Sequence, residues 1–124
     1  MALQAVLLAL SAGLAAACNL LFTGACTADL RWGVVVEVRD SVTGAPAADG
    51  ARLIVRDGAY ADTSDQLPFT EPLTLRAAGE RGGIYDVTVE KSDYRDWTRT
   101  RVRVREDQCH VIPVRLEARL QPAL

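Results

Sequence analysis

The chain has 124 residues, of which 49% are hydrophobic and 24% are charged, and its formal charge is −2 at pH 7. Without a targeting segment of about 20 residues, this length suits one domain with one hydrophobic core. Because 14 basic and 16 acidic side chains nearly cancel, the composition gives no electrostatic reason to bind nucleic acid.

The N-terminal part of the chain has the character of an export signal. No charged side chain occurs before Asp29. The apolar run over residues 2–17 is shorter than the about 20 residues that span a membrane, and it ends in the small residues that a signal peptidase requires. Residues 1–25 are therefore predicted to form a helical signal segment and a short linker, and the protein is expected in the periplasm or at the cell surface.

A possible lipid attachment site lies at the end of this run. The sequence Ala15-Ala16-Ala17-Cys18 resembles the bacterial lipobox, in which the cysteine carries the lipid. The resemblance implies lipidation of Cys18 and membrane attachment. It departs from the usual pattern at Ala15, where an aliphatic residue such as leucine is preferred, and in lacking an early Lys or Arg. Ordinary cleavage after Ala17 or near residue 25, and a retained N-terminal anchor, are the alternatives.

Strand patterning begins after residue 30. Val34, Val36 and Val38 alternate with a second set of side chains, which is the period-2 pattern of a half-buried strand. A turn rich in Asp, Ser, Gly and Pro follows over residues 40–46. The next strand is predicted at 51–56, and two strands joined by such a turn predict an antiparallel hairpin.

The rest of the chain continues the β pattern. Residues 57–72 are rich in Asp, Gly and Pro and predict a long loop with at most a short edge strand at 59–61. Six or seven short strands, with no amphipathic helix after residue 25, predict an all-β protein with a single antiparallel β-sandwich. The later strands are expected at residues 73–76, 85–90, 94–105 and 109–119.

Three segments carry a resemblance to a known family. Residues 33–40 (GVVVEVRD), 43–46 (TGAP) and 83–89 (GIYDVTV), followed by Tyr94, are similar to the carboxypeptidase regulatory-like domain. The resemblance covers about residues 30–120 and implies an Ig-like, transthyretin-like β-sandwich at 26–120 with a tail at 121–124. It also implies a non-catalytic folding or interaction module without a cofactor. Asp93 departs from the family pattern, which usually has glycine there.

In an exported domain of this kind, the three cysteines are expected to have two different roles. Cys26 precedes the first strand and Cys109 opens the last, so a disulfide between them would tie the ends of the sandwich together. A closed loop of about 80 residues would stabilise the fold by roughly 4 kcal/mol. Cys18 is then the unpaired cysteine, consistent with lipidation. The alternative is that Cys26 and Cys109 are unrelated free thiols.

The most distinctive surface feature is a row of four arginines. In the predicted strand they alternate with Thr and Val, so they are expected on one face, about 6.6 Å apart. Such a row suits acidic glycans, lipid headgroups or an acidic protein. The alternative is a solvated face whose charges pair across strands and discourage aggregation. The row consists of Arg99, Arg101, Arg103 and Arg105.

The sequence gives little support for a catalytic or metal-binding site. His110 is the sole histidine, and in an extended strand it faces away from the adjacent Cys109, so the two are poorly placed for zinc. No serine is placed near it in sequence. The acidic residues between 57 and 71 lack the spacing of an EF-hand calcium loop. No enzyme, cofactor or metal is therefore expected.

The sequence favours an exported structural or protein-interaction module of the cell envelope with an unknown envelope protein or glycan as partner. The alternative is a carbohydrate- or small-ligand-binding module that uses the 57–72 loop and exposed aromatic rings. Exposure of Tyr60, Phe69 and Trp97 on one face would support that alternative, whereas buried rings would count against it.

Overall fold

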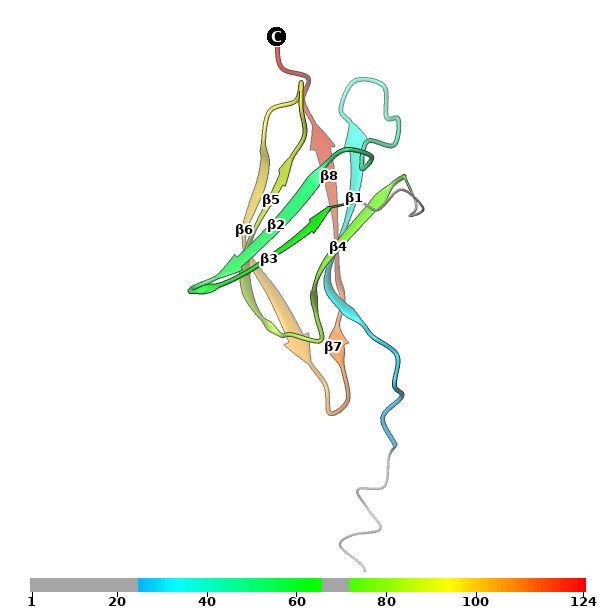
Figure 1. The fold of residues 1–124 in the computed structure, drawn as a ribbon, viewed down its shortest axis with the longest axis vertical. Coiled ribbons are helices and arrows are strands. Elements are labelled where there is room, and N and C mark those ends of the chain that lie inside the picture. The colour runs from blue at the N-terminus through cyan, green and yellow to red at the C-terminus, as the bar shows by residue number, and fades with distance from the viewer. Residues whose placement is uncertain (1–24, 66–71) are drawn as a thin grey trace, which may run out of the picture.

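The computed structural model describes residues 25–65 and 72–124, and these residues form β-strands without a helix (Figure 1). The predicted helical signal segment, Cys18 and Phe69 lie outside the described residues. No helix of the described part is long and apolar enough to span a membrane. The strands of the described residues are β1 (Trp32–Asp40), β2 (Arg52–Asp57), β3 (Tyr60–Asp65), β4 (Thr74–Gly79), β5 (Gly83–Glu90), β6 (Trp97–Glu106), β7 (Val111–Ile112) and β8 (Val114–Leu120).

The strands form two sheets that enclose one core (Figure 1). One sheet has the order β4-β1-β8 and the other has the order β3-β2-β5-β6-β7. Alternate residues such as Val34 and Val36 of one sheet and Leu53 and Val87 of the other belong to the same buried cluster, as period-2 patterning requires. Among the described residues, Tyr85 is the largest fully buried side chain. The predicted all-β, two-sheet class is confirmed, whereas the prediction that the strands pair only in antiparallel orientation is wrong, because β1 and β8 are parallel.

The predicted hairpin between the first two strands is wrong. Strand β1 pairs with β4 in antiparallel and with β8 in parallel orientation, whereas β2 belongs to the other sheet. After β1 the chain turns, with the N–H of Gly44 donating to Asp40 O (2.9 Å) and that of Ala47 to Val38 O (2.8 Å). It then crosses between the sheets at Ala47 and Ala48, which are buried. Hairpins and crossings use the same turn residues, so the sequence pattern did not separate them.

The prediction of a long loop over residues 57–72 is wrong for 62–65, because the short edge strand expected at 59–61 continues to Asp65. Strands β2 and β3 form a hairpin with six residue pairs, and Gly58 supplies the positive φ of 57° in its turn. Strand β3 lies at a sheet edge, where polar residues are tolerated because one side faces solvent. The side chain of Asp62 accepts a hydrogen bond from the N–H of Ala78 in β4 (2.9 Å).

Strand β6 contains a β-bulge that changes the predicted arginine row. Thr100 and Arg101 both lie opposite Asp86 of β5. Arg101 has a φ of 57°, and its N–H donates to the Asp86 carboxylate (3.4 Å). The extra residue reverses the alternation. Arg99 therefore lies on the side of the buried β5 residues, whereas Arg103 lies on the outer face, and the prediction of four arginines on one face is wrong.

Candidate functional site

Two arginines and two isoleucines meet on the outer face of the five-stranded sheet beyond the bulge. We call these residues the Arg–Ile patch (Ile84, Arg103, Arg105 and Ile112). Ile84 pairs with Arg103 across β5 and β6, and Arg105 pairs with Ile112 across β6 and β7. Ile84 is 54% and Ile112 is 51% exposed. The patch therefore combines positive charge with exposed apolar surface, which a water-facing sheet does not require.

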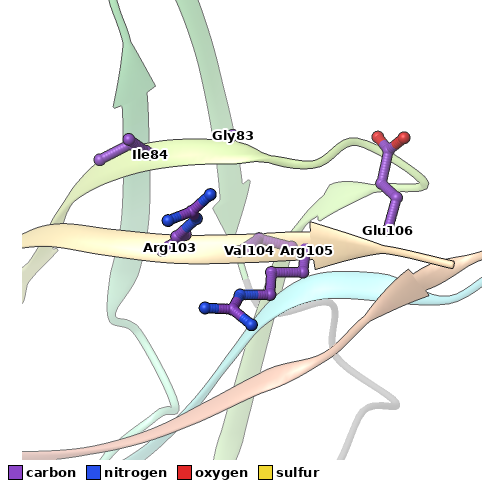
Figure 2. Close-up of a pocket in the computed structure, with 6 residues that line it drawn as sticks. All are labelled: Gly83, Ile84, Arg103, Val104, Arg105 and Glu106. Atoms are coloured by element: carbon purple, nitrogen blue, oxygen red, sulfur yellow. The ribbon is translucent and has the colours of Figure 1, made fainter.

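An open hollow of about 600 Å³ lies against this patch (Figure 2). Figure 2 shows Ile84 on β5 beside Arg103 on β6, with Glu106 at the end of β6. The Glu106 carboxylate accepts a hydrogen bond from the N–H of Gly82 (2.7 Å) and so holds the turn between β4 and β5. Because the hollow is open, it suits contact with a surface better than enclosure of a small molecule. Its lining residues are Gly83, Ile84, Arg103, Val104, Arg105 and Glu106.

The patch arginines have no acidic partner in the part of the chain that the structure describes. Within the described residues, Arg103 and Arg105 form no ion pair. Two carboxylates of the same pair of strands are engaged elsewhere, since Glu106 binds the turn and Asp86 accepts from the bulge and lies opposite Arg56 of β2. Each patch guanidinium thus keeps its hydrogen-bond donors for an external acceptor.

The other two arginines of the predicted row lie in different surroundings. The guanidinium carbon of Arg99 lies 5.3 Å from the ring centroid of Trp97, a cation–π contact on the inner side of the strand. Arg101 occupies the bulge. The structure thus brings together only Arg103 and Arg105 of the four. Reading the sequence alone missed Ile84 and Ile112, although their outward positions follow from the same alternation.

The described aromatic rings do not form an open platform. Tyr60, Tyr94 and Trp97 are partly buried and pack against the core. The guanidinium of Arg81 covers the Tyr60 ring at 3.8 Å from its centroid, and the ring meets Tyr85 edge-on at 6.1 Å. Burial raises the pKa of Tyr60. These contacts count against sugar stacking on Tyr60.

The segment before β1 is held by a second cluster, which we call the N-terminal clasp (Cys26, Thr27, Glu80, Cys109 and His110). Cys26 and Cys109 form the predicted disulfide, with their Cα atoms 5.2 Å apart. Nδ1 of His110 lies 2.7 Å from Oε1 of Glu80, and Nε2 lies 3.0 Å from Oγ1 of Thr27. The clasp joins this segment to the turns before β5 and β7.

The clasp contains a hydroxyl, an imidazole and a carboxylate in the order found in hydrolase triads. The sequence around Thr27 did not indicate its contact with His110, because the two residues are 83 positions apart in the chain. Glu80 is also bonded to the N-terminal segment, since its carboxylate accepts from the N–H of Arg31 (2.8 Å) and its own N–H donates to Arg31 O (2.8 Å). The N–H of Arg31, with His110 beside it, holds the pKa of Glu80 below its usual value. These bonds favour an attachment role.

Acidic side chains of the 57–72 segment bind protein groups. Asp57 pairs with Arg81 (3.2 Å), and Asp62 accepts from Ala78 N (2.9 Å). In residues 25–65 and 72–124, no three His, Cys, Asp or Glu side chains are grouped as a metal site. The chain matches no protein-family model, and no curated protein shows significant sequence similarity to it.

Proposed function

We propose that the protein is an exported, non-catalytic β-sandwich module of the bacterial cell envelope that binds an anionic partner through the Arg–Ile patch. The patch carries this proposal because two arginines, which have no acidic partner among the described residues, lie beside two half-exposed isoleucines. Arginine and apolar side chains together are typical of protein interfaces. An acidic envelope protein therefore fits the patch better than a uniformly charged glycan does.

The proposed module is a transthyretin-like sandwich of the carboxypeptidase regulatory-like type. Support comes from where the family-like segments lie. Residues 33–40 lie within the central strand of the three-stranded sheet, and residues 83–89 lie within β5 of the other sheet. Residues 43–46 lie in the connection between the sheets. Each segment of the resemblance therefore has a structural part to play in the same sandwich.

Export is supported by the disulfide, because such bonds persist in oxidising compartments and are rare in the cytosol. We further propose that a lipid on Cys18 tethers the domain. Since Cys26 is bonded to Cys109, the tether would lead to the end of the sandwich that holds β7 (Figure 1). The exported domain would then stand on the membrane with its clasp end nearest to the lipid.

The binding proposal is tested by retention on a matrix that carries an immobilised acidic polypeptide, along a salt gradient. The R103Q/R105Q variant is expected to bind at least about tenfold more weakly, because a hydrogen bond to a charged group contributes about 1.5 kcal/mol or more. The control R95Q/R119Q removes the same charge from exposed positions off the patch. Equal elution of both variants would show that net charge alone, and not the patch, governs retention.

The proposed location is tested by intact mass measurement of the protein from its native host. Lipidation predicts a mature chain that begins at Cys18 with added acyl mass, and a C18S variant that leaves the membrane fraction. A mature chain that begins after Cys18 without a lipid would refute the tether but leave export intact. Recovery of the full unprocessed chain from the cytosol would refute both.

A further inference from the structure

Strand β8 offers an unpaired edge. It lies at the end of the order β4-β1-β8 and pairs with β1 through seven consecutive residues without a register shift. On its other side, no strand of the described residues pairs with it. A regular edge of this kind is a template for hydrogen bonding to another strand.

The remaining edges of the described sheets are blocked. Strands β3 and β4, the two edges on the opposite side, are linked by the bond from Ala78 N to the Asp62 carboxylate. Strand β6 has its bulge at Arg101, and β7 covers its final residues. Bulges and covered ends are the usual means of preventing strand addition. Between Val114 and Arg119 the outer edge of β8 has no bulge and no paired strand among the described residues.

The charges along β8 are self-complementary. Its outer face carries Arg115, Glu117 and Arg119 in alternation, and all three are exposed. If two copies pair in antiparallel orientation about Leu116, Arg115 of each copy lies opposite Glu117 of the other. Opposite charges directly across a strand pair are favourable. Pairing centred on Glu117 would instead place like charges opposite one another.

A second register, in which Glu117 faces Arg119, would match charges equally well. That register requires a free edge beyond Leu120, but there the chain is already bonded. Pro122 forms a β-bridge with Tyr94, and the N–H of Arg95 donates to Gln121 O (2.9 Å). The register about Leu116 ends at Arg119 and so needs only the free part of the strand.

The side chains on the core-facing side of β8 also favour pairing with a second strand. Val114 and Leu116 pack against the core but remain partly exposed. A second β8 strand alongside would shield these side chains, which adds apolar burial to the main-chain hydrogen bonds. We propose that the protein forms a twofold-symmetric homodimer through antiparallel β8–β8 pairing about Leu116, joining two three-stranded sheets into one.

Charge reversal at this edge tests the proposal by sedimentation equilibrium of the full mature protein. R115E and E117R each place like charges opposite one another, and each change affects two symmetry-related pairs. Each variant should therefore weaken dimerisation by about tenfold or more. The double variant R115E/E117R exchanges the charges and should restore the dimer. Failure of this rescue would overturn the proposal.

The register has its own control. Arg119 lies opposite Pro113 in the proposed pairing and forms an ion pair with Glu117 of its own strand (2.7 Å). R119Q removes this competing pair and leaves Glu117 to Arg115 of the other copy, so it should keep or tighten the dimer, whereas loss of the dimer would refute this register. An L116C variant should form an intermolecular disulfide, because directly opposed residues bring their Cβ atoms within about 5.5 Å. A wild-type protein that stays monomeric at all accessible concentrations would refute the dimer itself.

Discussion

Removing the Cys26–Cys109 disulfide provides a quantitative test of how the N-terminal segment contributes to stability. The bridge joins residues separated by 83 positions. A cross-link that closes a loop of this size stabilises the folded state by about 4.5 kcal/mol, because it restricts the unfolded chain. The variant C26S/C109S would lose this full amount only if the folded state were otherwise unchanged.

The folded state does change, because the bridge also orders an exposed segment. Residues 25–31 lie before β1, are exposed, and are held besides the disulfide by contacts such as Thr27 with His110 and Arg31 with Glu80. Ordering a residue costs about 1–2 kcal/mol of conformational entropy. If one or two residues of the segment become free in the variant, the conformational entropy that they regain offsets part of the stability lost with the bridge. We therefore expect a net destabilisation of about 2–3 kcal/mol.

Urea unfolding of the oxidised protein, the reduced protein and C26S/C109S measures this loss. Both forms without the bridge should show a lower midpoint and a higher m-value, since their unfolded chains expose more surface. A T27V control removes the hydroxyl contact with His110 but keeps the bridge, and should cost no more than about 1 kcal/mol. Unchanged stability without the bridge would refute the reasoning, and a loss above the full loop value would mean that the segment is part of the cooperative core.

Three further substitutions test local interactions. Gly83→Ala places a Cβ 2.5 Å from Oδ2 of Asp57, so it should destabilise the protein by about 1–3 kcal/mol in urea unfolding, and by less in a D57A background. The N–H of Thr43 is the main cause that lowers the pKa of Asp40 from 3.8 to about 2. Folding therefore favours the ionised form of Asp40, so its contribution to the free energy of unfolding is complete above pH 3.8 and is lost as the pH falls towards 2. The D40N variant should lack this part of the acid transition. Identical stability–pH profiles of D40N and the wild-type protein would contradict this assignment. Arg101→Gly should raise the unfolding free energy by up to about 1 kcal/mol, because glycine adopts a positive φ without strain; a decrease would mean that the arginine side chain stabilises the bulge.

Local alternation predicted much of the fold because it depends on neighbouring residues. The valines at 34, 36 and 38 and the run from Tyr85 to Val89 alternate clearly, and both lie in strands with a buried face. Sheet membership is different, because it depends on which strands meet after the chain turns. The turn at 40–46 was recognised, but nothing in it specified that β2 would join the other sheet.

The bulge shows why the candidate site was harder to predict than the strands. In sequence, Arg99 to Arg105 alternate without interruption. The extra residue becomes visible only through the pairing with β5, where Thr100 and Arg101 share Asp86. Pairing geometry, and not composition, decides which arginines face solvent together. The same limit applies to Thr27 and His110, which meet across 83 residues.

The patch and the free edge of β8 are close in the chain but belong to different sheets, because the strand passes from one sheet to the other at Pro113. Pairing at β8 would leave the outer face of β5 and β6 accessible, so a dimer would present two patches. Two linked sites bind a multivalent surface more tightly than one. R115E should therefore weaken retention on a dense anionic matrix but leave the affinity of one patch for a short monovalent anionic ligand unchanged. R103Q/R105Q should weaken both and leave dimerisation intact. A parallel loss of ligand affinity and dimerisation in either variant would show that the two surfaces are not independent.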